Sequence, residues 1–373
     1  MNLREVVEKI GPEDQGAREE AHRRWSACAK PLGGLGFLET VVENVAALTG
    51  STAVDFGHRA LLVLCADNGV VAQGVTQSPS SVTAAVAGNL AAGRSSVCMM
   101  AKVARCRVVP VDMGILDFSG LPGLLDRRMG NGTQDISVGP AMTRRQAEQA
   151  VLTGIELVRE QQEQGCRLLA TGEMGIGNTT TSSAVACMLL GRQVQELTGR
   201  GAGLSDAGLE KKKKAVEMTV SRFYEKHPEY RNGTKEQYES GELSAVTVLA
   251  ELGGFDLAGM TGLFLGGAAA KIPVLTDGFL STVSGLLAVL IRKEAKDYML
   301  ASHISTEPAG AAVLQMLDLP APLHMGMHLG EGSGAVAMIP LLRMGAKVYE
   351  EMSTFSDISV EQYVDYQEKG ERP

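Results

Sequence analysis

From about residue 52 onward, apolar and polar positions come in blocks. Short runs rich in Val, Leu and Ile stop at a Gly or an acidic residue, and a longer stretch with helical periodicity follows. The clearest runs are RALLVLCADNG (59–69), RCRVVPVDMG (105–114), CRLLATGEMG (166–175), IPVLTDG (272–278) and DYMLASHIS (297–305). Runs that are apolar on both faces and separated by helices are typical of a parallel sheet covered on both sides. The pattern therefore predicts an α/β layered fold.

Most of these runs end close to a polar side chain that could carry chemistry. Because the carboxyl ends of parallel strands share one edge of a sheet, the loops that follow them should lie along one rim. We expect six side chains to converge there: Asp67, Asp112, Glu173, Asp277, His303 and Glu331.

The two ends of the chain differ from this pattern. Residues 1–50 read as helices without β-branched runs, and the segment from about 345 is polar, acidic and partly helical. The sequence thus predicts a large α/β catalytic domain over 51–344 and a small helical domain made from 1–50 with 345–373.

Composition narrows the class of protein. The net charge of −8 and the aromatic content of 4% argue against a nucleic-acid partner. Six cysteines without CxxC spacing, several in apolar runs, fit a reducing compartment. The N-terminus lacks the pattern of a secretory signal, and no apolar run reaches the roughly 18 residues of a membrane span. A cytoplasmic protein without membrane insertion is expected.

The first glycine-rich motif, ATGEMGIGNTT (170–180), follows an apolar run and precedes a helix that Asn178 or Thr179 would cap. Backbone N–H groups at such a turn suit a small anion, and Glu173 is placed for proton transfer. The motif lacks the lysine of GxxxxGK[ST] and does not match GxGxxG. A tight turn with glycines for packing alone is the alternative.

A second cluster, GRGAGLSDAGLEKKKK (199–214), leads into a basic helix. Its glycines are suited to complete a phosphate cradle, with Arg200 or one lysine supplying charge. We expect most of the four lysines to form a solvated helix face and at most one to reach a ligand.

The third motif, LHMGMHLGEGSG (323–334), places Glu331 between glycines before an apolar helix. The carboxylate at this position is consistent with a catalytic role or with simple stabilisation of the helix dipole. His324 and His328 have i,i+4 spacing, but Gly326 and Gly330 argue against a helix, and HExxH is absent. No metal is predicted.

The segment ADNGVVAQGVTQSPSSVTAA (66–85) runs from a strand end into a Gly/Pro/Ser loop. It mixes polar and apolar groups as a pocket for a flat ring requires, although an ordinary long βα loop would look the same. Ser78 and Ser80 have no GxSxG frame, so a hydrolase elbow is not supported.

These motifs together resemble a known family. KPLGGLGFLE, ADNGVVAQGV, SPSSVT, ATGEMGIGNTTTSSA, GRGAGLSDAGL, GGFDLAGMTG, LTDGF, SHISTEPA and HLGEGSGA occur in the order found in nicotinate-nucleotide:5,6-dimethylbenzimidazole phosphoribosyltransferases, over residues 30–345. The resemblance implies a glycosyltransferase with a Rossmann-like large domain, no cofactor, no metal and a homodimeric assembly. It implies transfer of the 5-phosphoribosyl group of nicotinate mononucleotide to a benzimidazole base, with inversion at C1′, in cobalamin biosynthesis.

The resemblance also implies roles for particular residues. It makes Glu331 the general base, because one azole nitrogen must lose its proton as the other attacks C1′. The nucleotide and its phosphate are assigned to Glu173, Gly175, Ile176, Gly177, Asn178, Thr179, Gly201 and Lys212. The base is assigned to Ser78, Val86 and Leu329.

The chain departs from the family pattern at two positions. Asn68 stands where the family commonly has His, and Val86 where a Gln is expected. Both changes are expected at the base pocket, so other benzimidazoles, purines or phenolic acceptors stay open. Two further readings stay open from the residues alone: an ATP- and Mg²⁺-dependent α/β kinase or hydrolase, and a nucleotide-binding protein without catalysis.

Overall fold

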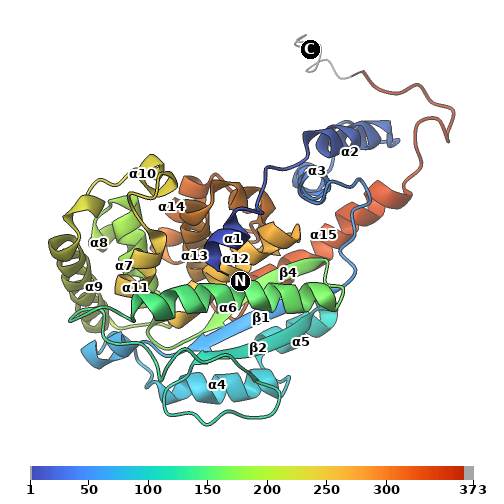
Figure 1. The fold of residues 1–373 in the computed structure, drawn as a ribbon. Coiled ribbons are helices and arrows are strands. Elements are labelled where there is room, and N and C mark those ends of the chain that lie inside the picture. Colours follow the sequence, from blue (N-terminus) through green and yellow to red (C-terminus); the bar gives the residue numbers. More distant parts are fainter. Residues whose placement is uncertain (1, 365–373) are drawn as a thin grey trace. The chain divides into compact units, whose positions relative to one another are not determined.

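The computed structural model describes residues 2–364 and contains one parallel sheet (Figure 1). Its strands are β1 (Arg59–Ala66), β2 (Arg107–Gly114), β3 (Leu125–Asp126), β4 (Leu168–Met174), β5 (Val274–Leu275) and β6 (Met299–Leu300). The strand order is β3-β2-β1-β4-β5-β6, and every neighbouring pair is parallel. The predicted α/β fold with a Rossmann-like parallel sheet is therefore confirmed.

Each of the five apolar runs identified in the sequence contains a strand. The central strand β1 shows why, because seven of its eight residues are buried, so that both faces of the strand must be apolar. Strand β3 has only two residues and a half-exposed pattern, and it gave no apolar run to detect.

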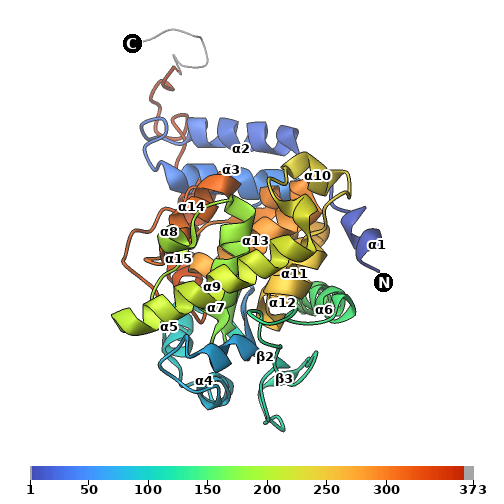
Figure 2. The same cartoon turned by 90° about the vertical axis from the view of Figure 1, so that its left-hand side faces the viewer.

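Helices cover both faces of the sheet. Figures 1 and 2 show α4 and α5 on one side and α6 and α12 on the other, while α7 packs against α9 and α13. The helices outside the chain ends are α4 (Ser81–Ala91), α5 (Ser96–Ala104), α6 (Arg144–Glu163), α7 (Asn178–Leu190), α8 (Val194–Leu197), α9 (Asp206–Lys226), α10 (Lys235–Glu239), α11 (Ala245–Leu252), α12 (Phe255–Ala270), α13 (Gly278–Ile291) and α14 (Pro308–Leu317). Short 3-10 helices occupy η1 (Gly69–Gln73), η2 (Pro228–Tyr230) and η3 (Lys293–Tyr298).

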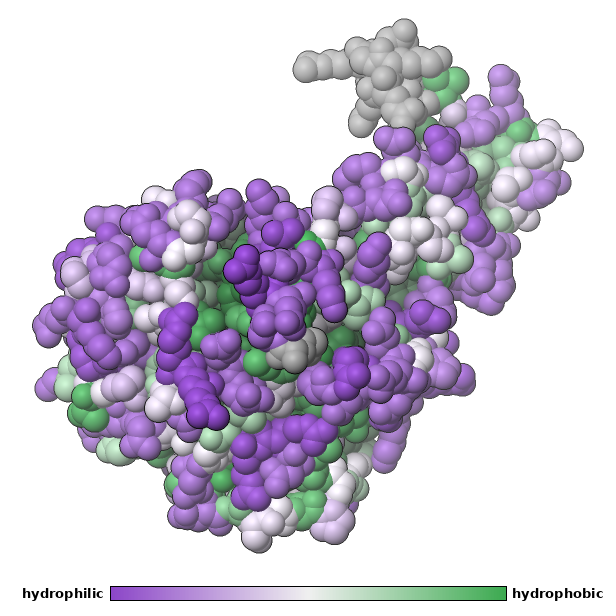
Figure 3. Space-filling view, in the orientation of Figure 1, coloured by the Kyte–Doolittle hydropathy of each residue, from purple (hydrophilic) through white to green (hydrophobic). Residues whose placement is uncertain are grey.

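The α6 and α12 helices approach each other closely because glycines lie at their crossing. A Cβ atom on Gly154 would overlap the carbonyl oxygen of Gly259, and one on Gly262 would overlap that of Val151. Helix α12 is buried over most of its length, whereas α6 has a polar outer side, which is visible in Figure 3. This crossing places α12 directly against the central strands.

The strand order reverses direction between β1 and β4. In open parallel sheets, ligands bind outside the carboxyl ends of the strands at this point. Leu64 of β1 pairs with Glu173 of β4, so the segment that carries Glu173 leaves the sheet at this switch point.

The chain forms two compact units. Of the described residues, the larger contains 2–11 and 58–338, and the smaller contains 12–57 and 339–364. Residues 2–11, which the sequence grouped with the small helical domain, lie in the larger unit, where α1 (Leu3–Val7) contacts α12 and α6. The Ile10 carbonyl accepts a hydrogen bond from the Arg292 guanidinium at 2.7 Å.

The smaller unit joins both ends of the chain. It holds α2 (Gln15–Ala27), α3 (Phe37–Thr49) and the second half of α15 (Ser333–Glu351). Trp25 packs on Tyr349 with ring centroids 5.0 Å apart, and Cys28 forms an antiparallel bridge with Thr354. The predicted small domain extends to residue 373, and its last part, 365–373, lies outside the described residues. Within residues 2–364, no helix is long and apolar enough to cross a membrane.

Candidate active site

Two glycine-rich segments that are about 150 residues apart meet at the carboxyl edge of β4. The Glu331 backbone N–H donates to the Glu173 carbonyl oxygen at 3.2 Å. A Cβ atom on Gly172 would lie 2.7 Å from the Glu331 carbonyl oxygen, and one on Gly330 would lie 2.5 Å from Glu173 Oε1. Gly172 therefore lets the two backbones touch, and Gly330 leaves room for the Glu173 carboxylate.

Asp277, which closely follows β5, fixes the second of these segments. Its carboxylate accepts hydrogen bonds from the backbone N–H groups of Gly332 at 2.8 Å, Gly334 at 2.7 Å and Ala335 at 3.2 Å. Asp277 thereby satisfies free N–H groups at the start of α15. Burial raises its pKa to about 7, although the three N–H groups oppose this rise.

Glu331 lies at the turn into α15 with φ of +60°, a left-handed conformation that favours glycine. Burial raises the pKa of its carboxyl, while hydrogen bonds from the Ser95 hydroxyl and the Val97 backbone N–H oppose the rise. Its Oε2 atom is buried and has no hydrogen-bond partner within residues 2–364. Glu331 as a whole is half-buried and lines the smaller cavity described below, so its carboxylate is suited to take a proton from a bound molecule.

Glu173 lies deeper than Glu331. Burial raises the pKa of its carboxyl to about 8, and the neighbouring Asp256 and Asp277 add to the rise. The Asn178 side-chain amide donates to Glu173 and opposes it. Because a carboxyl with this pKa holds its proton at neutral pH, Glu173 can donate as well as accept a hydrogen bond.

A buried lysine marks another side of the site. Lys212 on α9 is fully buried, and its Nζ donates to Thr179 Oγ1 and to the Gly199 carbonyl oxygen, both at 2.9 Å. Burial lowers its pKa to about 8, although Glu307 opposes the change. Lys211 and Lys214 are exposed and Lys213 pairs with Glu210, so Lys212 is the buried one of the four.

The loop before α9 is held next to this lysine. The Gly201 backbone N–H donates to Glu307 Oε1 at 2.9 Å, and Gly201 has φ of +54°. Thr179 lies in the first turn of α7, whose N-cap is Gly177. The N-terminus of α7, the hydroxyl of Thr179 and the Lys212 ammonium together form a site suited to a phosphate group.

A cavity of about 270 Å³ lies among these groups. Ten of the twelve site residues named from the sequence line it: Ser78, Val86, Glu173, Gly175, Ile176, Asn178, Thr179, Gly201, Leu329 and Glu331. The other two, Gly177 and Lys212, lie outside the cavity wall. Lys212 contacts it through Thr179, whereas Gly177 packs on Val71 and Asn68.

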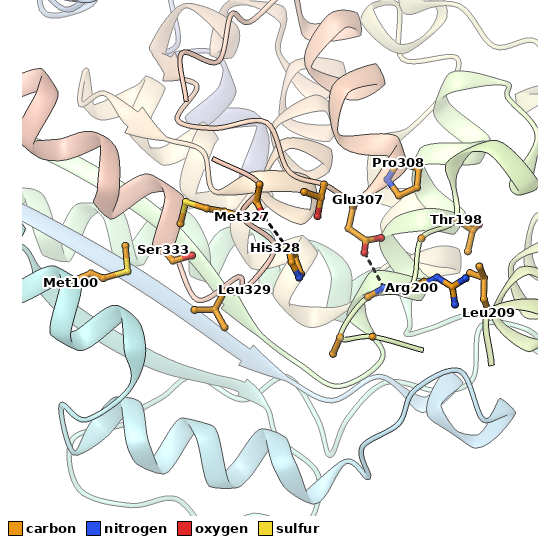
Figure 4. Close-up of a pocket in the computed structure, with 16 residues that line it drawn as sticks. Met100, Thr198, Arg200, Leu209, Glu307, Pro308, Met327, His328, Leu329 and Ser333 are labelled. Carbon is orange, nitrogen blue, oxygen red and sulfur yellow. Dashed lines mark hydrogen bonds between the residues drawn. The ribbon is translucent and has the colours of Figure 1, made fainter. Parts of the chain in front are cut away.

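A larger cavity of about 860 Å³ adjoins the first and shares Gly201, Ala202, Glu307, His328 and Leu329 with it. Figure 4 shows Met100, Met327, Leu329 and Ser333 on one side, Thr198, Arg200 and Leu209 on the other, and His328 and Glu307 between them. The two cavities therefore lie side by side along these shared residues.

Three groups differ from their expected positions. Asn68 is buried beside Gly177 and does not line either cavity, so of the two departures from the family pattern only Val86 lies at the pocket. Asp67 and Asp112 lie at the carboxyl ends of β1 and β2, but they do not line either cavity. Asp67 accepts from the Thr83 hydroxyl at 2.6 Å, and Asp112 accepts from the Gly114 and Ile115 N–H groups at 2.9 Å.

Several lining residues were not predicted as site residues, including Val82, Phe279, Ser305, Glu307 and His328. The sequence contained a signal for Ser305 and Glu307, because both follow the β6 run at the same sheet edge. His324 and His328 are not helical. Within residues 2–364, no three His, Cys, Asp or Glu side chains are grouped to hold a metal ion.

Sheet topology and cavity together define an α/β enzyme site built for a phosphorylated small molecule. The family model described as "Phosphoribosyltransferase" matches residues 10–360. The chain is similar to the nicotinate-nucleotide–dimethylbenzimidazole phosphoribosyltransferase of Ruminiclostridium cellulolyticum, with 39% identity over 97% of this chain and 99% of the relative. The enzyme of the same name from Roseiflexus sp. strain RS-1 is 39% identical over 96% of this chain and 98% of its own length.

Solved structures show the same similarity. The crystal structure of CobT from Thermus thermophilus matches with a TM-score of 0.85 and 36% identity, over 93% of this chain and 100% of that chain. The chain belongs to the nicotinate-nucleotide–dimethylbenzimidazole phosphoribosyltransferase family, and it is a glycosyltransferase-type enzyme.

Proposed function

We propose that this chain transfers the 5-phosphoribosyl group of nicotinate mononucleotide to a benzimidazole base, with 5,6-dimethylbenzimidazole as the first candidate. The products are nicotinate and α-ribazole 5′-phosphate, with inversion at C1′. The observation that carries the proposal is the backbone contact of Glu331 with Glu173 beside one cavity, with Lys212 buried at its edge. The relatives named above support the choice of substrates.

The phosphate of the nucleotide is assigned to the Lys212 side of the cavity. The Lys212 ammonium, the Thr179 hydroxyl and the backbone N–H groups of the first turn of α7 offer positive charge and donors there, and Gly201 lines the cavity beside them. Gly175, Ile176 and Asn178 line the cavity next to them, and Gly177 gives the turn its left-handed conformation.

The acceptor base is assigned to the wall formed by Ser78, Val86 and Leu329. Val86 offers no hydrogen bond where a Gln is expected from the family, so this wall recognises an acceptor mainly by shape and apolar contact. A base carrying methyl groups, such as dimethylbenzimidazole, suits such a wall better than a purine with exocyclic polar groups.

In the reaction, one azole nitrogen attacks C1′ while the bond from C1′ to the nicotinate nitrogen breaks. The electron pair of that bond neutralises the pyridinium, so the leaving group needs no proton. The second azole nitrogen loses its hydrogen to the Glu331 carboxylate, which removes the positive charge formed on the new product. Holding both rings in line across the ribose supplies much of the remaining rate enhancement.

Replacement of Glu331 tests this assignment. We expect Glu331→Gln to lower the single-turnover rate by about 10²- to 10⁴-fold, the usual contribution of a general base, with binding of nicotinate mononucleotide unchanged. Glu225→Gln, an exposed position on α9, is the matched control. An unchanged rate in Glu331→Gln would contradict the base assignment, and a wild-type enzyme without transfer would contradict the proposed function.

Two further properties belong to the proposal. The six cysteines are all buried and reduced, which supports a cytoplasmic location. The family resemblance supports a homodimer, and analytical ultracentrifugation of the whole chain measures the assembly directly.

A further inference from the structure

His303 is a buried imidazole at the candidate site that the proposed reaction leaves without a role. It lies shortly after β6 in the chain, is 4% exposed and lines the smaller cavity. Its ring lies in a slot between two glycines from distant parts of the chain. A Cβ atom on Gly334 would overlap the ring, and one on Gly278 would lie 3.2 Å from its Nε2 and Cε1 atoms. The slot holds the ring in one plane.

The hydrogen bonds around His303 fix which nitrogen carries the proton. The Ser302 hydroxyl donates its single hydrogen to the Thr276 carbonyl oxygen at 2.6 Å, because a carbonyl can only accept. The contact of 3.2 Å between Ser302 Oγ and His303 Nδ1 must then be donated by Nδ1. Asp277 Oδ1, 4.0 Å from Nδ1, favours a proton on the same nitrogen.

The other ring nitrogen is consequently an acceptor. Burial lowers the pKa of His303, which keeps the ring neutral and leaves a lone pair on Nε2. Nε2 has no hydrogen-bond partner within residues 2–364, and it is not among the buried polar atoms that are sealed from solvent. Gly278, the residue next to Nε2, itself lines the smaller cavity. The free acceptor therefore faces the space where a ligand would bind.

We infer that His303 Nε2 accepts a hydrogen bond from a ribose hydroxyl of the bound nucleotide and so selects ribose over deoxyribose. The inference rests on the proposed function, which supplies the substrate. At neutral pH, nicotinate mononucleotide carries hydrogen-bond donors only at its 2′ and 3′ hydroxyls, since its ring, carboxylate and phosphate offer acceptors. The azole N–H of the acceptor base has its own partner in Glu331. His303 is thus a positioning residue for the sugar.

The selectivity test compares nicotinate mononucleotide with its 2′-deoxy and 3′-deoxy analogues. A buried acceptor left without a donor typically lowers binding by about 10- to 100-fold. We expect the wild-type enzyme to discriminate to this extent in kcat/KM against one of the two analogues. We expect His303→Phe to lower kcat/KM for the ribose substrate and to reduce the discrimination to about twofold or less. His58→Phe, at an exposed position before β1, is the matched control and keeps the discrimination.

A second measurement needs neither a variant nor turnover. The ¹⁵N chemical shifts of the His303 ring in the wild-type protein report which nitrogen is protonated. We expect a protonated Nδ1 and a bare Nε2 that shifts when nicotinate mononucleotide binds. In Ser302→Ala, which removes the acceptor for Nδ1, the proton should move partly to Nε2 and the discrimination should fall.

The outcomes separate the two claims. A wild-type enzyme that transfers phosphoribose, with deoxyribose discrimination that survives His303→Phe, overturns the role of His303 and leaves the proposed function intact. A protonated Nε2 in the wild-type protein also overturns it. A change confined to the choice of acceptor base would place His303 at the base and contradict its contact with the sugar.

Discussion

The substitution Glu173→Gln should stabilise the larger unit in a manner that depends on pH. Glu173 is half-buried at the cavity wall, and desolvation raises the pKa of its carboxyl to about 8 from the usual 4.5. Between these two pH values the unfolded chain releases this proton and the folded chain keeps it, so the free energy of unfolding falls as pH rises. Glutamine keeps the carbonyl oxygen that accepts from Asn178 but has no proton to release.

The magnitude follows from the displacement of the pKa. One pKa unit corresponds to about 1.36 kcal/mol, so an isolated group displaced this far would change the stability by about 5 kcal/mol between pH 4.5 and pH 8. Asp256 and Asp277 ionise at lower pH than Glu173, so in both proteins they do so beside a neutral side chain, and their titration leaves the difference between the two proteins unchanged. We therefore expect Glu173→Gln to gain about 2–4 kcal/mol over the wild type between pH 5 and pH 8.

The assay must report on the larger unit. The single tryptophan, Trp25, lies in the smaller unit, so its fluorescence follows the wrong part of the chain. Urea unfolding followed by far-ultraviolet circular dichroism at pH 5 and pH 8, with hydrogen exchange of the β4 amides, avoids this problem. Glu225→Gln serves as the exposed control.

The reasoning would be refuted if Glu173→Gln and the wild type differed in stability by the same amount at pH 5 and pH 8. Glu173 would then ionise normally in the folded protein. The same variant should raise the KM for nicotinate mononucleotide. An effect confined to the benzimidazole would show that Glu173 is misassigned.

Three other substitutions have expected outcomes. The Lys212 ammonium loses its proton with a pKa of about 8, so the KM of the wild type for the nucleotide should rise above pH 8. Lys212→Met should have a KM about 10- to 100-fold higher, with little pH dependence. If KM depends on pH in the same way in both proteins, Lys212 does not belong to the phosphate site. Gly334→Ala should destabilise the larger unit by about 1–3 kcal/mol in urea unfolding because its Cβ overlaps the His303 ring, while Gly139→Ala has open space and should be neutral. Asp277→Asn places an amide donor against N–H groups at the start of α15, so the free energy of unfolding of the larger unit should fall by about 1–3 kcal/mol. An unchanged midpoint of urea unfolding would contradict the capping role of Asp277.

The strands were predictable because burial on both faces leaves a continuous apolar run, and the switch point then fixes which loops meet. Strand β3 was not, since two residues carry no periodic signal. The sequence motif limited the lysine expected at the site to one of four. The burial of Lys212, however, depends on α7 and the 199–203 loop packing around it.

The limits of the sequence are clearest at Asn68 and His303. A departure from the family pattern at Asn68 suggested a change in the base pocket, yet the side chain is buried and its Oδ1 atom lies beside Gly254. His303 was expected at the rim, but its tautomer depends on Ser302, Thr276 and Asp277, which only the folded chain brings around the ring.

The pairing of Cys28 with Thr354 has a consequence for how the protein is made. Residues 12–57 leave the ribosome early, whereas their partners in the stretch 339–364 leave it after about 280 further residues have emerged. At typical synthesis rates of about 5–20 residues per second, α2 and α3 wait for tens of seconds before the 339–364 segment can pack on them. The smaller unit can therefore close only after nearly the whole chain has been synthesised.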